Sequence, residues 1–243
     1  MAKEMIELHN FSIGYESRKL LDNVNAAMNA GNLTALIGRN GSGKSTLLRA
    51  IAGLNSKYTG NIVIDGLDIT KINTHELAHR LAFVNTQRTR IANLTCLQLV
   101  GLGRTPYTDW IGRLSTKDTE AVEKALEAVG MQEYSRRTLD TMSDGECQRV
   151  MVARALAQDT PVILLDEPTS FLDLPNRYEL CVLLGKLAHE LNKCVLFSTH
   201  ELEIAMRMCD NIVLVDNPHL HIMPTDEMRK SGLIERLFGK IVI

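Results

Sequence analysis

The chain has 243 residues, of which 45% are hydrophobic and 23% charged, and its formal net charge is −2. This length and composition are typical of a globular protein with a substantial core, and the charge gives no general basis for nucleic-acid binding. Wholly apolar runs span only a few residues, far fewer than the roughly 20 that a membrane-spanning helix requires. The N-terminus also lacks the apolar core of a signal peptide. We therefore expect a cytosolic protein whose membrane role, if it has one, comes through a partner.

The N-terminal part of the chain predicts an antiparallel strand layer. Residues 6–13 alternate apolar and polar side chains with the period of a strand, and residues 20–28 resume the alternation after a break. Residues 60–66 predict another short strand that ends in Asp-Gly, a dipeptide typical of hairpins. Between them, residues 33–37 form a short, mostly apolar run without this alternation, which also predicts a strand. We expect the antiparallel layer to lie beside this strand.

Residues 38–46 read Gly-Arg-Asn-Gly-Ser-Gly-Lys-Ser-Thr and match the phosphate-binding pattern G-x-x-x-x-G-K-[ST]. They follow the predicted strand and precede an apolar helical run at residues 47–52, which is the expected context. The glycines let the backbone approach an anion and visit positive φ, so that N–H groups and the helix start bind phosphate. Lys44 can reach the β- and γ-phosphate oxygens, and the Ser45 hydroxyl can bind Mg²⁺. The predicted nucleotide contacts are Gly38, Asn40, Gly41, Ser42, Gly43, Lys44, Ser45 and Thr46.

The segment after residue 73 predicts a short helix and a buried strand. Thr74 is expected to cap a helix over residues 75–80, and the apolar residues 81–84 predict the strand. Gln87 follows at the C-terminal end of that strand, where ligands bind in α/β sheets.

Residues 92–142 have a helical pattern and predict an insertion between two halves of a sheet. Residues 101–108 are expected to form a loop. Ser115 or Thr116 is expected to cap a helix that continues to about residue 129, where Gly130 closes it.

The rest of the chain alternates helices and strands, as α/β proteins do. Ser143 and Glu146 match the capping box S-x-x-E at the start of a helix. The predicted segments are a helix at 143–158, an apolar strand at 161–166, a helix at 176–192, a strand at 193–197, a helix at 201–209 and a last core strand at 211–215.

Two acids follow the apolar strand at 161–166. Asp166 ends this strand, a position from which nucleotide hydrolases hold Mg²⁺. Glu167, one residue further, can face the γ-phosphate and activate a water molecule. The alternative is a surface acid pair at a turn before Pro168, which the phosphate loop upstream makes the weaker interpretation.

Two further polar residues lie at predicted strand ends. Gln87 has the chemistry to meet Mg²⁺ or the attacking water, although a single Gln in a loop is usually only solvated. His200 follows a buried strand and could contact the γ-phosphate and help to orient Glu167 or the water. The alternative for His200 is a structural residue or a helix cap.

The helix that begins at Ser143 offers a second anion site. Helix N-termini attract anions, but Asp144 and Glu146 complement the helix dipole themselves and repel phosphate. Phosphate could bind only if these carboxylates point away, which leaves the Ser143 hydroxyl and the Gly145 N–H as contacts. The alternative is a capping box without a ligand.

The order of these motifs resembles the ATP-binding subunits of ABC transporters over essentially the whole chain. The resemblance rests on residues 38–45, Gln87, 142–146, 162–168, 170–173 and His200. It implies an α/β fold with a P-loop NTPase core, an N-terminal antiparallel β layer and an inserted helical subdomain. The implied single domain spans residues 1–243, with the β layer and core at 1–91 and 143–215, the helical subdomain at 92–142 and a C-terminal tail at 216–243. The signature sequence of the family is usually Leu-Ser-Gly-Gly-Gln, from which this chain departs at Met142, Asp144 and Glu146.

The resemblance also implies cofactors, partners and further site residues. Two such subunits, expected to form a homodimer, enclose two ATP molecules with Mg²⁺, and each site joins the phosphate loop of one chain to Ser143 and Gly145 of the other. Tyr15 resembles the aromatic residue that stacks on adenine, and Asp173 resembles the acid that links the two sites. The segment after Gln87 is expected to receive the transmembrane permease, with a substrate-binding protein acting indirectly. The subunit would lie in the cytoplasm, peripheral on the inner face of the membrane, without a nucleic-acid partner.

A finer resemblance concerns the class of transporter. Residues 103–108 and the Ser-Asp-Gly-Glu sequence are similar to those of importers for iron–siderophore, haem or cobalamin complexes. The alternative function is a soluble ABC-type ATPase associated with nucleic acid or the ribosome. Such proteins usually carry two cassettes or long coiled-coil inserts, which this sequence lacks.

Overall fold

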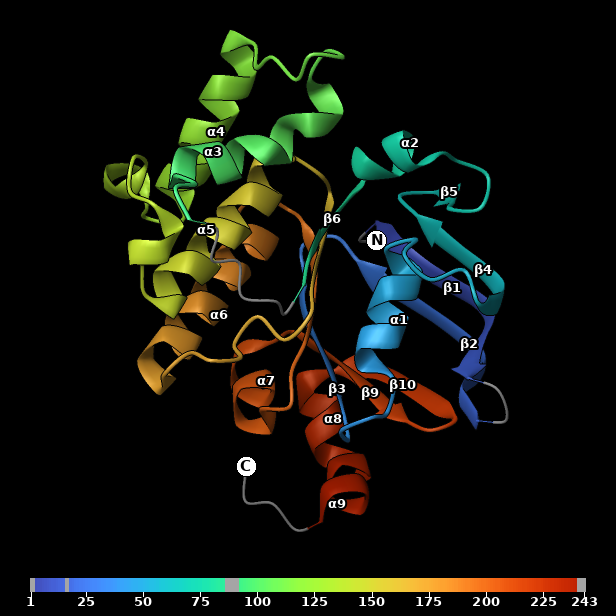
Figure 1. Ribbon diagram of the computed structural model, residues 1–243. Helices are drawn as coiled ribbons and strands as arrows, with labels where there is room; N and C mark the ends of the chain where they lie inside the picture. The colour runs from blue at the N-terminus through green and yellow to red at the C-terminus, as the bar shows by residue number, and fades with distance from the viewer. Residues whose placement is uncertain (1–2, 16–17, 86–91, 240–243) are drawn as a thin grey trace.

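The computed structural model describes residues 3–15, 18–85 and 92–239, and two β-sheets organise them (Figure 1). One sheet has four strands in the order β2-β1-β4-β5, and the other has six in the order β10-β9-β3-β8-β7-β6. The strands are β1 Glu4–Tyr15, β2 Arg18–Asn29, β3 Leu33–Gly38, β4 Tyr58–Ile64, β5 Leu67–Asp68, β6 Leu81–Val84, β7 Val162–Leu165, β8 Cys194–Ser198, β9 Asn211–Asp216 and β10 His219–Pro224.

The helices lie in two groups around the six-stranded sheet. Helix α1 lies between the two sheets, whereas α5 and α6 cover the opposite face of the six-stranded sheet, and α3 and α4 pack on the outer side of α5 (Figure 1). The helices are α1 Lys44–Ile51, α2 Thr74–Ala78, α3 Cys96–Gly101, α4 Thr116–Ala128, α5 Asp144–Ala157, α6 Leu174–His189, α7 Leu202–Met208, α8 Thr225–Lys230 and α9 Leu233–Phe238, with 3-10 turns η1 Leu102–Tyr107, η2 Gln132–Tyr134 and η3 Leu139–Thr141. Within the described ranges, no helix has both the length and the apolar composition to cross a bilayer.

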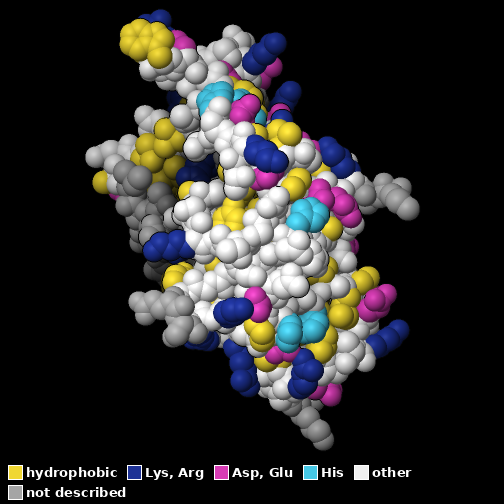
Figure 2. Space-filling view, turned by 90° about the vertical axis from the view of Figure 1, so that its right-hand side faces the viewer, with side chains coloured by type: hydrophobic (Ala, Val, Ile, Leu, Met, Phe, Trp, Pro, Cys, Tyr) yellow, Lys and Arg dark blue, Asp and Glu magenta, His cyan; other side chains and the backbone are white. Residues whose placement is uncertain are grey.

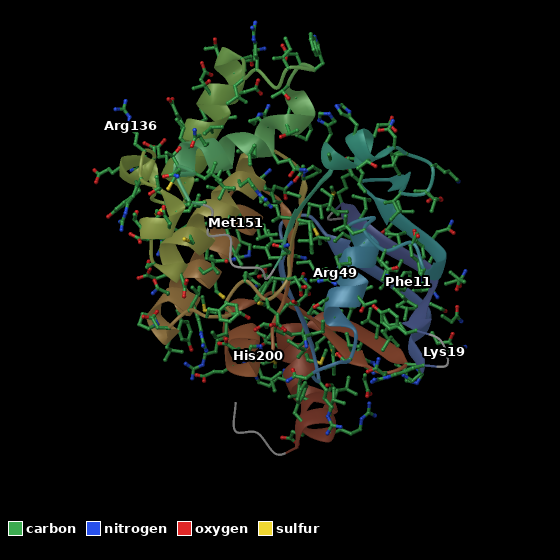
Figure 3. The ribbon with its side chains drawn as sticks, in the orientation of Figure 1. Phe11, Lys19, Arg49, Arg136, Met151 and His200 are labelled. Carbon is green, nitrogen blue, oxygen red and sulfur yellow. The ribbon has the colours of Figure 1, made fainter. Side chains whose placement is uncertain are left out.

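The antiparallel layer forms where the alternating pattern predicts it. Strands β1, β2 and β4 pair antiparallel, and their inward side chains, among them the fully buried Phe11, belong to one apolar cluster with residues of α1. Figure 3 shows Phe11 on this layer beside α1. The outward face mixes Lys and Arg with Asp and Glu side chains (Figure 2). This layer is therefore amphipathic, with one face on the core and one toward solvent.

The central strands are parallel and buried on both faces, as their unbroken apolar runs predict. Every residue of β3, β7 and β8 is buried. β8 pairs with β3 on one side and with β7 on the other. Because parallel strands end at the same edge of a sheet, Gly38, Asp166 and Thr199 come together there.

The helical insertion packs on α5, and one predicted loop within it is a helix. Residues 102–107 form the 3-10 turn η1 rather than the expected loop. Arg104 is buried there, donates from Nε to Asp118 of α4 at 2.9 Å and from Nη1 to the Ala157 carbonyl at 2.7 Å. The Tyr107 ring packs on the Arg104 guanidinium. This polar network fixes a segment that has no apolar periodicity.

Several predicted boundaries are wrong by one or two residues because a neighbouring polar side chain caps the helix. Asn73, not Thr74, caps α2 through a capping box with Glu76. Asp173 caps α6, which therefore begins at Leu174 rather than at residue 176. For α4 the cap is Ser115, one of the two residues predicted for it.

The strand at 211–215 belongs to the core, but it is not the last strand of the sheet. Strand β10 pairs antiparallel with β9 and adds an edge to the six-stranded sheet. Its side chains are only partly buried, so its sequence lacks the apolar run that identifies the inner strands.

Candidate nucleotide site

The loop between β3 and α1 has the backbone conformation that its glycines allow. Gly41 has φ 72° and Gly43 has φ 103°, values that residues with a Cβ rarely adopt. The prediction that the loop glycines adopt positive φ does not hold for Gly38, whose φ is not positive. A Cβ on Gly38 would instead lie 2.7 Å from the Ser42 hydroxyl and 3.0 Å from Cβ of Val215, so close packing requires this glycine.

Lys44 begins α1 and lies inside the loop. Its side chain is buried, and Nζ donates to the Gly38 carbonyl at 3.1 Å. Burial lowers the pKa of the Lys44 ammonium, while the carboxylates of Glu167 and Asp166 act in the opposite direction. The loop thus holds a partly desolvated cation that a polyphosphate would neutralise.

Three oxygen-bearing side chains meet: Ser45 from the first turn of α1, Asp166 after β7 and Ser198 at the end of β8. The Asp166 Oδ1 atom accepts from the Ser45 hydroxyl at 2.9 Å and from the Ser198 hydroxyl at 2.7 Å. The register of the parallel strands, with Leu165 opposite Phe197, places Asp166 beside Ser198. Hard oxygen donors of this kind suit Mg²⁺, which usually takes one or two protein ligands together with substrate phosphates and water.

Glu167 is held in a strained backbone conformation. Its φ is 47°, in the left-handed region that costs a residue with a Cβ roughly 1–2 kcal/mol. Its N–H donates to the Ser198 hydroxyl at 2.8 Å, and its Oε2 atom accepts from the Ser170 hydroxyl at 3.1 Å. Nδ1 of His200 lies 4.0 Å from the same Oε2 atom. These contacts fix where the carboxylate points.

One cavity is lined by several of these groups. Its volume is about 670 Å³, within the range of small-molecule sites. It is lined by Tyr15, Arg18, Leu20, Asn40, Gly41, Gly43, Lys44, Ser45, Thr46, Glu167 and His200. Figure 3 shows His200 near the end of the parallel strands from which the phosphate loop starts.

Tyr15 lies at the rim of this cavity. Its side chain is exposed, and its hydroxyl is 3.0 Å from the Thr46 hydroxyl. Arg18, at the start of β2, reaches the Gly41 carbonyl with Nη2 at 3.5 Å. An exposed aromatic ring and a cation therefore stand beside the phosphate loop, where a nucleotide could use both.

The start of α5 lies outside this cavity, and its carboxylate is turned back onto its own helix. Ser143 accepts through Oγ from the Glu146 N–H at 3.2 Å, and Glu146 Oε2 accepts from the Ser143 N–H at 2.7 Å. Arg137 donates to Glu146 Oε1 at 3.2 Å. Glu146 thus meets the condition for anion binding, because its carboxylate is held by the backbone N–H and the side chain of Ser143 and by Arg137.

Gly145 and Asp173 are brought together by Asn176. Asp173 Oδ1 accepts from the backbone and side-chain nitrogens of Asn176, at 3.1 and 2.6 Å. The Asn176 amide lies 3.2 Å from the position that a Cβ on Gly145 would occupy. A residue larger than glycine at 145 would displace this amide. Ser143, Gly145 and Asp173 thus form a second group, apart from the cavity lining.

Glu146→Gln is expected to lower the free energy of unfolding at neutral pH by less than about 1 kcal/mol. The Ser143 N–H holds the pKa of Glu146 below its usual value of 4.5. A carboxyl with a lowered pKa stabilises the fold above its unfolded-state pKa, and the contribution is lost as the pH falls through the folded-state pKa. Denaturant unfolding of both proteins should show the difference at about pH 7 and not at about pH 3. An equal difference at both values would contradict the assigned cause.

The structure brings together most of the predicted site residues and adds others. Gln87 lies outside the described residues. Ser198, Ser170 and Arg18 were not predicted as site residues. A hydroxyl at the end of an apolar strand is the signal that could have identified Ser198. Arg18 is brought to the loop by the pairing of β1 with β2, which no local pattern indicates.

Comparison with known proteins identifies the family. Residues 21–170 match the model of the ABC transporter family. The chain belongs to this family. It is 36% identical, over 95% of its length and 88% of the relative's, to the iron(3+)-hydroxamate import ATP-binding protein FhuC of Bacillus subtilis. The chain is also similar to the structure of an inward-facing ABC transporter of the metal-chelate type. The match covers 97% of this chain and 89% of the transporter chain, with a TM-score of 0.85 and 26% identity. A second similar structure is a dimeric ATP-binding cassette bound to ADP and Pi. The match covers 91% of this chain and 99% of the cassette chain, with a TM-score of 0.76 and 28% identity.

Membership of the ABC transporter family confirms the predicted fold and the predicted ATPase activity. It also supports the transport prediction over the soluble alternative. As a member of this family the chain binds ATP, and Asp166 and Glu167 stand beside the loop between β3 and α1.

Proposed function

We propose that this chain is the ATP-hydrolysing subunit of an importer for iron–siderophore, haem or cobalamin complexes. The observation that carries the proposal is the meeting of Lys44, Ser45, Glu167 and His200 around one cavity, with Asp166 hydrogen-bonded to Ser45 behind the lining. The class of cargo is supported by the relative named for iron(3+)-hydroxamate import and by the transporter of the metal-chelate type. The subunit would work in the cytoplasm, at the inner face of the membrane, bound to a permease through the segment after Gln87.

The phosphate loop and Lys44 would bind the triphosphate. The N–H groups around Gly41 and Gly43 and the N-terminus of α1 present partial positive charge to it. The ammonium of Lys44 is buried beside them and is already oriented by the Gly38 carbonyl. Tyr15 would stack on adenine, and Arg18 would add a cation at the rim.

Ser45 and Asp166 would hold Mg²⁺, with Gln87 as a further ligand. When bound, this ion neutralises charge on the β- and γ-phosphate oxygens. In the described structure the Ser45 hydroxyl donates to Asp166, so the two side chains are already adjacent. Ser198 holds the Asp166 carboxylate from the other side.

Glu167 would accept the proton of the attacking water. Its carboxylate is oriented by Ser170 and lies beside His200, which would contact the γ-phosphate. A positioned carboxylate contributes typically 10²- to 10⁴-fold to such a reaction. The strained φ of Glu167 is consistent with a residue placed for function rather than for stability.

A second chain would supply the remaining wall of the site. The Ser143 hydroxyl and the Gly145 N–H lie apart from the cavity of their own chain, and the Glu146 carboxylate is turned away. In a head-to-tail dimer they would donate hydrogen bonds to the γ-phosphate, where negative charge develops. Asp173, held by Asn176, would link the two sites.

Lys44→Met is expected to abolish the rise in melting temperature that ATP causes, without lowering the melting temperature of the nucleotide-free protein. Methionine has a similar length and carries no charge. Burial lowers the pKa of Lys44, which means that the charged ammonium destabilises the nucleotide-free fold relative to the neutral amine. Ligand binding stabilises the folded state in proportion to the logarithm of ligand concentration over Kd. Thermal melts over a range of ATP concentrations measure both quantities.

The same variant tests transport. Wild-type subunit reconstituted with its permease in vesicles should hydrolyse ATP and take up ferric siderophore, haem or cobalamin supplied on the substrate-binding protein. The Lys44→Met subunit should do neither. ATP hydrolysis by the wild type that no metal chelate stimulates would contradict the proposed cargo. Uptake at the wild-type rate by vesicles that contain the Lys44→Met subunit would contradict the proposed role of the subunit.

A further inference from the structure

Two segments approach Glu167 from different parts of the chain. The turn after β7 brings the Ser170 hydroxyl to 3.1 Å from Glu167 Oε2. The loop after β8 brings His200 Nδ1 to 4.0 Å from the same oxygen. The position of this carboxylate therefore depends on how the turn and the loop are held relative to each other.

Arg177 connects these two segments. It lies in the first turn of α6, and its Nε donates to the Leu172 carbonyl at 2.7 Å. Its Nη1 lies 2.9 Å from Oε2 of Glu201. Leu172 is two residues after Ser170, and Glu201 directly follows His200. One guanidinium thus bridges the turn that carries Ser170 and the loop that carries His200.

The partner of Arg177 on the loop is a poorly solvated acid. Only 13% of the Glu201 side chain is exposed, and its second oxygen, Oε1, is buried without a hydrogen-bond partner within the described ranges. The Glu201 N–H donates to the Thr199 hydroxyl at 3.0 Å, across His200. An unpaired carboxylate destabilises the folded state more when it is poorly solvated than when it is exposed. Loss of Arg177 would therefore shift Glu201, and with it the adjacent His200.

We propose that Arg177 is a positioning residue for ATP hydrolysis. It holds His200 and Ser170 in register around Glu167 and does not itself line the nucleotide cavity. An arginine suits this place because its rigid planar fork offers donors to two partners in fixed directions, which a lysine cannot do. The inference rests on the roles proposed for Glu167 and His200.

The first test is Arg177→Ala in the assembled transporter. We expect kcat to fall on the order of 10- to 100-fold, as for other displaced reacting groups, and KM for ATP to stay near that of the wild type. We expect kcat and KM to respond differently because Arg177 is not among the residues that line the nucleotide cavity. Arg207→Ala is the matched control, because Arg207 pairs with Glu203 on the exposed surface of α7, and it should leave kcat unchanged. The rise in melting temperature with ATP should persist in both variants.

The second test is a double-mutant cycle. If Arg177 acts partly through Glu201, then Arg177→Ala combined with Glu201→Gln should be no slower than Arg177→Ala alone, because the neutral amide no longer needs the cation. Arg177→Lys should recover part of kcat. Losses that add in the double variant, an unchanged kcat in Arg177→Ala, or equal losses in kcat and ATP binding would overturn the inference. Absence of ATP hydrolysis by the wild-type transporter would instead overturn the proposed function.

Discussion

Glu167→Gln is expected to slow ATP hydrolysis by about 10²- to 10⁴-fold and to leave ATP binding intact. The amide has the shape of the carboxylate and can still accept the hydrogen bond from Ser170, but it cannot accept a proton from water. Lys44 and the phosphate loop are unchanged in this variant, so the triphosphate keeps its contacts. Steady-state turnover and the ATP-dependent melting temperature, measured on the same preparation, separate the two effects.

The same variant should also accumulate as an ATP-bound dimer. If hydrolysis reopens the dimer, slowing the chemical step traps the closed state, which size-exclusion chromatography with light scattering detects. Glu123→Gln is the matched control, because Glu123 lies exposed on α4, and it should behave as the wild type. Turnover near the wild-type rate in Glu167→Gln would remove Glu167 from the role of general base.

The parts of the site that depend on local sequence were predictable. The glycine spacing, the preceding apolar strand and the following helix define the phosphate loop, because each is encoded by residues close together in the chain. The capping box at Ser143 is local in the same way, and the structure contains it. Asp166 and Glu167 were predicted as site residues because they come at the end of a wholly apolar strand.

The parts that depend on contacts between distant segments were not predictable. Ser198 meets Asp166 only because β8 lies between β3 and β7 in the sheet, and sequence periodicity does not give the order of parallel strands. The left-handed conformation of Glu167 is imposed by its surroundings, since a glutamate has no intrinsic preference for it. Arg177 bridges segments whose separation is set by the whole core. Strand β10 escaped prediction because it is an edge strand with a mixed pattern.

The proposed dimer, in which each ATP site joins the phosphate loop of one chain to Ser143 of the other, predicts that two inactive variants restore each other. Lys44→Met lacks the loop cation, and Ser143→Ala lacks the hydroxyl proposed to reach the γ-phosphate of the other chain. Removing one such donor costs about 10²- to 10³-fold in kcat. In a mixed dimer, one site combines both defects, and the other joins the intact loop of the Ser143→Ala chain to the intact Ser143 of the Lys44→Met chain. Mixing the two subunits should therefore give turnover well above that of either variant alone.

The restoration discriminates between a shared site and a site within one chain. If Ser143 served only its own phosphate loop, every chain in the mixture would carry a complete defect, and mixing would recover nothing. Ser115→Ala is the matched control for the loss of a helix cap, because Ser115 forms a capping box at the start of α4 as Ser143 does for α5. Each serine contributes about 1 kcal/mol of capping, so a loss of turnover confined to Ser143→Ala follows from the missing donor and not from a weakened helix. Activity in Ser143→Ala equal to that in Ser115→Ala would mean that the acidic signature of this cassette binds no phosphate through its serine.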